Sequence, residues 1–474
     1  MEKFKPKSKF VRSAGILVGG TAGSQLMLVI AAPLLTRLYS PESFGVLAVY
    51  ASLLSLFAVV ASLRYELAIP ISENEDEASS LVILSLIIVC ATSVLALLLV
   101  ISVGDSLLGA LNILQLSKYL WLLPIGVFCI GAYQVFNNYS IREKNFSRIA
   151  NAKLQQAFAV LCIQFAGYKF GVASLILGQI IGQSAGSLSL GKVALSRINR
   201  KEQSVSKLFN VAARYKRFPI YSTWAALFNT FGGQLPALLF ATFFSVQAAG
   251  FYSLAYRVLA LPITVLGASI GSVFLADVAD AYRDGTLRGK FDIVHRKLAQ
   301  MAMPFALILM IAGERVFPLI FGDQWRVAGH FAQWMAPWLY FVFVTSPMSS
   351  SFEAMGRHSE QLIFQATLFT VRASSIVLGA IFGGLEVAII AFSLGSAMCW
   401  AGFLMRSYSN LQADLKSSVV PTIQALAWGL LCTAPLIFSK LKATSTPVFV
   451  GLLGVTLIFC SLRLYFVMKA AAAK

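Results

Sequence analysis

The residues of this chain that could do chemistry include two arginines that lie deep inside long apolar runs. Arg372 is about ten residues from either end of the run 363–382, hence ~15 Å from each end at 1.5 Å per helical residue. Arg257 lies about ten residues into the run 247–276. A charge inside a membrane span is costly and usually faces an internal cavity or a polar partner, so both arginines are candidate binding residues. The alternatives are an Arg372 paired inside the packed helices and an Arg257 that reaches outward to the membrane surface.

A second group of charged residues lies at the ends of such runs. Arg64 and Glu66 follow the run 44–63, and their spacing of two residues predicts that they do not face each other on a helix. They fit either an interfacial anchor with a solvated acid or a gating pair, and Glu66 is the acid best placed for coupling to protons. Arg37 and Tyr39 follow the first run, where anchoring and gating are equally compatible with the sequence.

Amides recur within the runs, whereas motifs for catalysis are missing. Interhelical hydrogen bonds are the ordinary role of such amides. His295, His330 and His358 are far apart in predicted loops, and no GxxxxGK[ST] sequence is present for a nucleotide phosphate. We therefore expect no enzyme activity, no catalytic residue, no metal site and no cofactor. The amides are Gln25, Gln134, Asn137, Asn138, Gln164, Gln179, Gln183, Asn229 and Gln234.

The elements that must position these residues are membrane-spanning helices. Hydrophobic residues make up 58% of the 474 residues and charged residues 12%, against about 25% charged in soluble proteins. A span needs about 20 mainly apolar residues, and the runs are continuous rather than alternating. The sequence predicts an all-α polytopic membrane protein with fourteen spans, at 14–36, 44–63, 79–103, 119–138, 154–170, 171–191, 219–244, 247–276, 301–321, 331–352, 363–382, 387–405, 421–438 and 447–468.

The basic residues predict the orientation of these spans. With both termini on one side, the segments on that side hold 28 Lys and Arg and the opposite loops hold six. This bias is typical of cytoplasmic loops, so we expect both termini in the cytoplasm. The net charge of +18 then faces anionic lipid, and nucleic-acid binding is not implied.

Two halves of the chain resemble each other. The segment 40–45 (Ser-Pro-Glu-Ser-Phe-Gly) aligns with 245–250 (Ser-Val-Gln-Ala-Ala-Gly), and 109–124 aligns without gaps with 322–337. The offsets of 205 and 213 residues indicate that six spans are repeated by six more, which predicts a pseudo-twofold axis along the membrane normal and a site between two bundles. The predicted division is an N-terminal bundle at 1–200, a cytoplasmic amphipathic linker at 201–218, a C-terminal bundle at 219–410 and an appended helix pair at 411–474.

Several segments resemble one family of membrane proteins. Pro33-Leu-Leu-Thr-Arg-Leu-Tyr-Ser-Pro-Glu-Ser-Phe-Gly45, with Leu63-Arg-Tyr-Glu-Leu-Ala-Ile69, resembles the amino-terminal signature of bacterial polysaccharide flippases of the Wzx type. Segments 250–257 and 321–338 look like later blocks of the same family, which belongs to the multidrug/oligosaccharidyl-lipid/polysaccharide exporter superfamily. The resemblance covers about residues 10–410.

This resemblance implies export of undecaprenyl-diphosphate-linked oligosaccharide, for O-antigen or another surface polysaccharide, across the bacterial inner membrane by alternating access. It implies lipid-linked oligosaccharide and membrane lipids as ligands, and a polysaccharide polymerase and a chain-length regulator as partners. By resemblance, Arg257 and Arg372 would bind the diphosphate. From their positions in the sequence, Arg64 would help to capture the substrate, Asn229 and Gln234 would contact sugar hydroxyls, and Gln25 would also bind the substrate. Glu66, Arg37 and Tyr39 would serve gating or coupling.

Two other functions remain open on the sequence. A drug or cation antiporter of the same superfamily would be expected to carry acids within its spans, where this chain carries arginines. A polysaccharide polymerase or ligase would need a large outer loop, whereas the longest predicted outer loop, 104–118, has fifteen residues.

Overall fold

The computed structural model describes residues 9–198, 204–260, 262–263, 278, 280–349, 351–352, 355 and 357–472. The chain divides into two compact units, Met1–Ser253 and Leu254–Lys474, with the division inside one helix. The described residues form helices and no strand. The all-α prediction is therefore confirmed.

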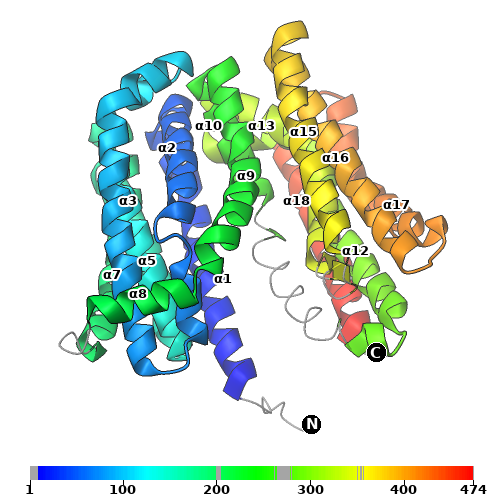
Figure 1. Cartoon of the computed structure of the whole chain (residues 1–474). Coiled ribbons are helices and arrows are strands. Elements are labelled where there is room, and N and C mark those ends of the chain that lie inside the picture. Colours follow the sequence, from blue (N-terminus) through cyan, green and yellow to red (C-terminus); the bar gives the residue numbers. More distant parts are fainter. Residues whose placement is uncertain are drawn as a thin grey trace. The chain divides into compact units, whose positions relative to one another are not determined.

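The first unit is built from upright helices and one short crosswise helix (Figure 1). Its closest helix packing joins α6 to α7, α1 to α6, α5 to α7 and α3 to α5. The helices are α1 (Lys9–Leu38), α2 (Pro41–Val60), α3 (Glu75–Ala110), α4 (Ser117–Leu120), α5 (Leu123–Arg142), α6 (Phe146–Ala166), α7 (Val172–Arg197), α8 (Val205–Arg214), α9 (Thr223–Phe243) and the start of α10 (Val246–Leu259).

Within the described residues, the second unit contains the end of α10 and six further α-helices. Its closest packing joins α12 to α13, α15 to α16, α12 to α17 and α13 to α16, and α18 packs on α17. These helices are α12 (Leu287–Phe321), α13 (Arg326–Thr345), α15 (His358–Phe382), α16 (Gly384–Asn410), α17 (Leu415–Leu441) and α18 (Thr446–Ala472). The predicted span 247–276 coincides with α10 at its start, and most of its remainder lies outside the described residues.

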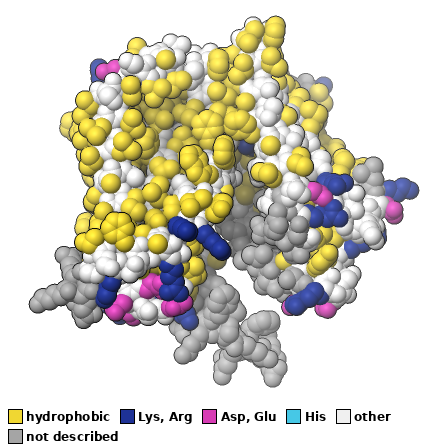
Figure 2. Space-filling view, viewed as in Figure 1, with side chains coloured by type: hydrophobic (Ala, Val, Ile, Leu, Met, Phe, Trp, Pro, Cys, Tyr) yellow, Lys and Arg dark blue, Asp and Glu magenta, His cyan; other side chains and the backbone are white. Residues whose placement is uncertain are grey.

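Many of these helices are suited to cross a membrane. Within the described residues, eight helices are long and apolar enough, namely α1, α2, α3, α12, α15, α16, α17 and α18, and a bent pair would make nine. Figure 2 shows hydrophobic side chains over much of the visible face, with charged groups gathered near α8 and at loop ends. The chain is a multi-pass membrane protein. The count of fourteen spans stays a prediction, although each predicted range overlaps a helix.

The first unit contains a bend and a turn near the same end. The segment Leu114–Leu120 meets α5 at 64°, with Pro124 in the first turn of α5. The turn predicted near residues 168–171 is confirmed, because α6 ends at Ala166 and α7 begins at Val172. Gly171 has φ 58°, which a residue without Cβ adopts at little cost. This turn sets α6 and α7 side by side.

The predicted amphipathic linker contains α8. Ser204 caps this helix by accepting a hydrogen bond from the backbone N–H of Lys207. Val211 is buried, whereas Phe209 is 71% exposed. Arg214 forms ion pairs with Glu73 and Glu77, which hold α8 across the start of α3. An apolar side that the protein does not cover and a basic side fit a helix at a membrane surface.

The two aligned glycine segments contact each other reciprocally. A Cβ on Gly45 would collide with the carbonyl oxygen of Val246, and a Cβ on Gly250 would collide with that of Pro41. With the offset of 205 residues, Val246 corresponds to Pro41 and Gly250 to Gly45. A contact of residue i with j and of j with i is what a twofold axis produces. The first turns of α2 and α10 therefore meet as the repeat predicts.

The division by contacts differs from the predicted domain boundaries. Helix α9, which was expected in the second bundle, packs on α2 within Met1–Ser253. The hydroxyl of Ser52 on α2 donates to the amide oxygen of Gln234 on α9, over 3.0 Å. The six-plus-six-plus-two organisation stays a prediction from the repeat.

Candidate functional site

Arg372 lies at the centre of an aromatic cluster in the second unit. Its guanidinium carbon is 4.8 Å from the ring centroid of Trp338 and 5.8 Å from that of Phe392. Its Nε donates to the Ser396 hydroxyl over 3.3 Å. These side chains come from α13, α15 and α16, which pack on one another. Cation–π contacts hold a guanidinium in place without neutralising it, so the positive charge is retained within the span.

Arg257 is next in sequence to a residue that contacts this cluster. The preceding residue, Tyr256, stacks on Trp338 with ring centroids 5.9 Å apart. Both Tyr256 and Arg257 have exposed side chains, and Arg257 lies in the last turn of α10. The aromatic stack thus links the α10 segment of Arg257 to the residues around Arg372. The predicted binding roles of both arginines stay proposals.

The prediction that Arg64 and Glu66 face apart was wrong. Arg64 Nη1 is 3.6 Å from Glu66 Oε1, and the Ser62 hydroxyl donates to Glu66 Oε2. The reason is that α2 ends at Val60, so the spacing rule for an α-helix does not apply here. Leu63 and Arg64 have φ of 50° and 64°, and a 3-10 helix follows over Tyr65–Ile71.

Glu66 is the most deeply buried acid of this region. Its side chain is 2% exposed, whereas that of Arg64 is 25% exposed. Burial raises the pKa of Glu66 above its usual range, although the Ser62 hydroxyl and the Arg64 guanidinium oppose the shift. Because its pKa is raised, this carboxyl group takes up and releases a proton at higher pH than an exposed one. The predicted coupling role therefore stays a proposal with a physical basis.

Tyr39 and Arg37, the other predicted gating residues, differ in burial. Tyr39 is buried, its hydroxyl donates to the Gln164 carbonyl oxygen, and it lies 2.9 Å from the Ser174 hydroxyl. It therefore ties α1 to α6 and α7, which is an anchoring contact. Arg37 has an exposed side chain.

The three predicted sugar-binding amides lie on two helices of the first unit. Gln25 on α1 and Asn229 on α9 are exposed. Gln234 is half-buried and accepts the hydrogen bond from Ser52 described above, which is the interhelical role typical of such amides.

Sequence reasoning missed a cation inside the first unit. Lys153 was assigned to the loop 139–153, but α6 begins at Phe146, so Lys153 lies in its second turn. The Lys153 ammonium donates to Thr21 Oγ1 over 2.9 Å. One turn later, Gln156 Nε2 donates to Gln183 Oε1 on α7 over 3.3 Å. The spacing of Lys153 and Gln156 by three residues was the available signal for a polar helix face.

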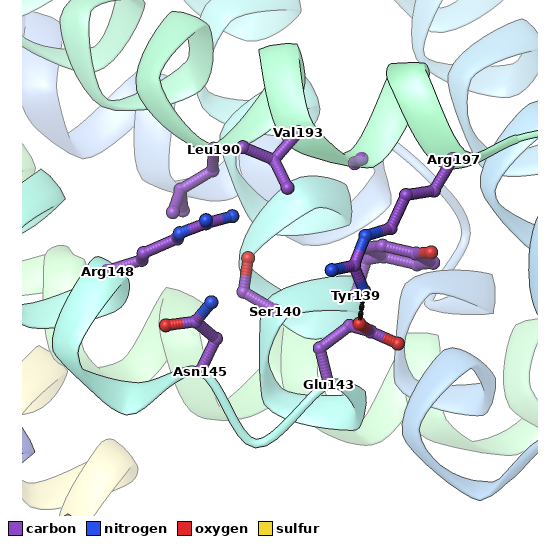
Figure 3. A pocket seen from close by; sticks show the side chains of 9 residues that line it. Tyr139, Ser140, Glu143, Asn145, Arg148, Leu190, Val193 and Arg197 are labelled. Carbon is purple, nitrogen blue, oxygen red and sulfur yellow. Dashed lines mark hydrogen bonds and ion pairs between the residues drawn. The ribbon is translucent and has the colours of Figure 1, made fainter.

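A shallow pocket lies at the end of the first unit where α5 joins α6. Figure 3 shows Arg197 directed toward Glu143, with which it is paired, while Arg148 and Asn145 flank Ser140 on the other side. Tyr139, Leu190 and Val193 also line it. None of the predicted site residues lines this pocket.

The three histidines were predicted to lie in loops, but His330 lies in α13 and His358 begins α15. His295 does not lie in a loop either. It is fully buried on α12, with Nδ1 2.9 Å from the Tyr408 hydroxyl and Nε2 3.4 Å from Thr422 Oγ1. Thr422 in turn receives a hydrogen bond from Tyr340 over 3.2 Å. This chain of partners joins α12, α13, α16 and α17, and it accounts for a buried histidine as part of helix packing.

Comparison with known proteins identifies relatives of this chain. Residues 34–329 match the model of a family described as polysaccharide biosynthesis protein. The chain is 23% identical to the succinoglycan biosynthesis transport protein ExoT of Rhizobium meliloti over 397 residues, 83% of this chain and 78% of that protein. It is 25% identical to the lipopolysaccharide biosynthesis protein WzxC of Escherichia coli over 228 residues, 47% of this chain and 45% of that protein.

Solved structures share the fold. The structure of the lipid II flippase MurJ in an inward closed conformation matches with a TM-score of 0.74 at 13% identity, over 96% of this chain and 99% of that chain. An inward-facing multidrug resistance transporter of the MATE family matches with a TM-score of 0.61 at 16% identity, over 89% of this chain and 96% of that chain. At these identities the likeness concerns the fold.

Proposed function

This chain belongs to the polysaccharide biosynthesis protein family, and we propose that it flips undecaprenyl-diphosphate-linked oligosaccharide repeat units from the cytoplasmic to the periplasmic leaflet. The family match over residues 34–329 is the observation that carries the proposal. The relative with the longest alignment is named as a succinoglycan biosynthesis transport protein, and the flippase that shares the fold is named for a lipid-linked substrate.

The physical problem of such transport is the head group. A diphosphate and many hydroxyl groups must cross hydrocarbon, while the polyprenyl tail can stay in lipid. Fixed cations and amides lower this barrier, because they replace the water that the charged groups lose. Arg372 fits the role of a diphosphate ligand, since aromatic rings hold its guanidinium inside the predicted span and a guanidinium pairs well with phosphate oxygens. Arg257 would act with it, and Arg64 would meet the substrate earlier.

The location follows from the same proposal. The chain would lie in the bacterial inner membrane with both termini in the cytoplasm, as the bias in basic residues predicts. The exposed apolar side of α8 would then lie on the inner leaflet. Transport would proceed by alternating access without a nucleotide. A polysaccharide polymerase and a chain-length regulator would take the product onward.

Deletion of the gene in its own host tests this function. We expect loss of the surface polysaccharide and accumulation of lipid-linked repeat units in the membrane, both reversed by the wild-type gene on a plasmid. Unchanged surface polysaccharide without accumulated precursor would contradict the proposal. Altered drug susceptibility under those conditions would favour the antiporter instead.

A further inference from the structure

We propose that a polar face inside the first unit, formed by Tyr133, Gln134, Asn137, Lys153 and Gln156, binds the sugar–diphosphate head group of the lipid-linked substrate. We call it the Lys153 face. The inference rests on the proposed function and adds a cationic subsite to it, in a unit of the chain that does not contain Arg372 or Arg257.

The position of Lys153 within α6 is the first support. It is seven residues from the start of the helix at Phe146, hence ~10 Å along the helix axis at 1.5 Å per residue. Its side chain is half-buried and lies against α1 through Thr21. Lys153 thus lies between packed helices rather than in a solvated loop, and a partly buried cation of this kind calls for a polar or anionic partner.

The hydrogen bonds of Lys153 leave capacity for a ligand. An ammonium group has three N–H donors. Within the described ranges Lys153 has a single hydrogen-bond acceptor, Thr21 Oγ1, and no ion pair. Two donors and a full positive charge are therefore available to an anionic group.

The amides on α5 provide acceptors. Tyr133, Gln134, Asn137 and Asn138 recur at helical spacing and are all half-buried. Gln134 Oε1 and Asn137 Oδ1 are buried atoms without a hydrogen-bond partner in the described part of the chain. Buried acceptors of this kind are rare in native proteins, because leaving them unpaired costs free energy. Hydroxyl groups of a sugar would supply the missing donors.

The two helices bring these groups to the same level. Tyr133 on α5 lies close to Gln156 on α6, and the helices run antiparallel through the short connection 143–145. Asn137 lies one turn nearer that connection than Tyr133, and Lys153 lies about one turn nearer it than Gln156. Asn137 and Lys153 therefore lie at about the same depth along the two helices.

This combination of groups defines the ligand class. A cation with free N–H donors matches a phosphate, and amide oxygens beside a tyrosine match hydroxyl groups. A purely anionic ligand would leave the acceptors unused, and a neutral glycan would leave the ammonium unpaired. A sugar joined to a diphosphate uses both.

Binding by variants of Lys153 tests the inference. Lys153→Met keeps the length of the side chain and suits a membrane helix, and Lys153→Arg keeps the charge. We expect Lys153→Met to weaken binding of undecaprenyl diphosphate to the purified protein by roughly tenfold or more, and Lys153→Arg to retain most of it. The matched control is Lys192→Met, which removes an exposed lysine of α7 and should bind as wild type.

Undecaprenol and inorganic pyrophosphate separate the parts of this ligand. Undecaprenol should bind wild type and Lys153→Met equally, since it lacks the anion, whereas pyrophosphate should bind the variant more weakly. Equal affinity of wild type and Lys153→Met for undecaprenyl diphosphate would overturn the inference. The inference would also be overturned if Lys153→Arg lost binding and both variants had a lower melting temperature. That result would show that Lys153 serves helix packing and not binding.

Export in cells distinguishes this inference from the proposed function. If deletion abolishes the surface polysaccharide and Lys153→Met restores it fully, the Lys153 face is wrong and the proposed function stands. If deletion leaves the polysaccharide unchanged, the proposed function fails whatever the variant does. The expected result is that Lys192→Met and Lys153→Arg restore the polymer and Lys153→Met does not.

Discussion

Arg372 could be located from the sequence, but its surroundings could not. The distance of about ten residues to either end of its run predicted a deep cation. Its partners Trp338 and Phe392 come from two other helices, so only packing brings them together. Tryptophans of membrane proteins mostly lie at the membrane–water interface, so a contact of Trp338 with Arg372 was not expected from the sequence.

Replacement of Arg372 tests its charge against its packing. We expect Arg372→Gln to abolish surface polysaccharide at normal protein levels, because the diphosphate loses a charge-assisted partner. Arg372→Lys should retain part of the polymer, since an ammonium keeps the charge but not the planar stacking. Polymer is measured on gels beside Arg326→Gln, an exposed arginine that should have no effect. Full polymer in Arg372→Gln would remove Arg372 from the site.

The Arg64–Glu66 pair could not be derived from spacing. Two consecutive residues with positive φ, Leu63 and Arg64, redirect the chain, and neither is a glycine or asparagine that would signal it. Once the chain leaves the α-helix, Arg64 can reach Glu66 and Ser62 can reach it as well.

The raised pKa of Glu66 predicts a specific pH dependence. Between its ordinary value of 4.5 and the higher value in the folded protein, the folded state binds more protons than the unfolded state. The free energy of unfolding therefore falls as pH rises through this window. We expect Glu66→Gln to flatten the fall in melting temperature of the detergent-purified protein as pH rises above 4.5, because a neutral amide has no charged form to desolvate. An identical slope in wild type and Glu66→Gln would contradict this, with the exposed Glu42→Gln as control.

At the level of helices, the apolar runs predicted the presence of each helix well but its first residue poorly. Helix α12 starts at Leu287 although its apolar run starts at residue 301, and α6 starts at Phe146 rather than at residue 154. A charged residue indicates where the chain leaves the hydrocarbon core, but the helix can continue beyond that point. The prediction ended the helices at the charged residues and so placed Lys153 and His295 in loops. The repeat between residues 40–45 and 245–250, by contrast, predicted a relation that the helix contacts bear out.

The reciprocal glycine contact between α2 and α10 predicts a strict size limit. Gly45→Ala places a Cβ against the Val246 carbonyl group, and Gly250→Ala does the same at Pro41. Overpacking of this kind costs about 1–3 kcal/mol, so we expect a lower melting temperature and reduced export from each variant. The control is Gly454→Ala on α18, where nothing lies within 4 Å of the added atom. Variants at residues 45 and 250 that behave like Gly454→Ala would show that the helices do not approach so closely.

At the level of the whole chain, the repeat and the charge bias together predict the topology. The predicted even number of spans and the concentration of basic residues in alternate segments predict that both termini lie in the cytoplasm. We expect green fluorescent protein fused after Lys474 to fluoresce, and alkaline phosphatase inserted in the segment 104–118 to be active. Active phosphatase at the C-terminus would reverse the orientation or change the parity of the spans.

Transport of the substrate by the purified chain tests the central claim most directly. The protein would be reconstituted in liposomes that carry undecaprenyl-diphosphate oligosaccharide from the host, and the fraction accessible to an external glycosidase would be followed over time. We predict that the protected fraction becomes accessible with wild-type protein and Lys192→Met, and stays protected with Arg372→Gln and in protein-free liposomes. A protected fraction that is the same with and without wild-type protein would contradict the assignment as a flippase.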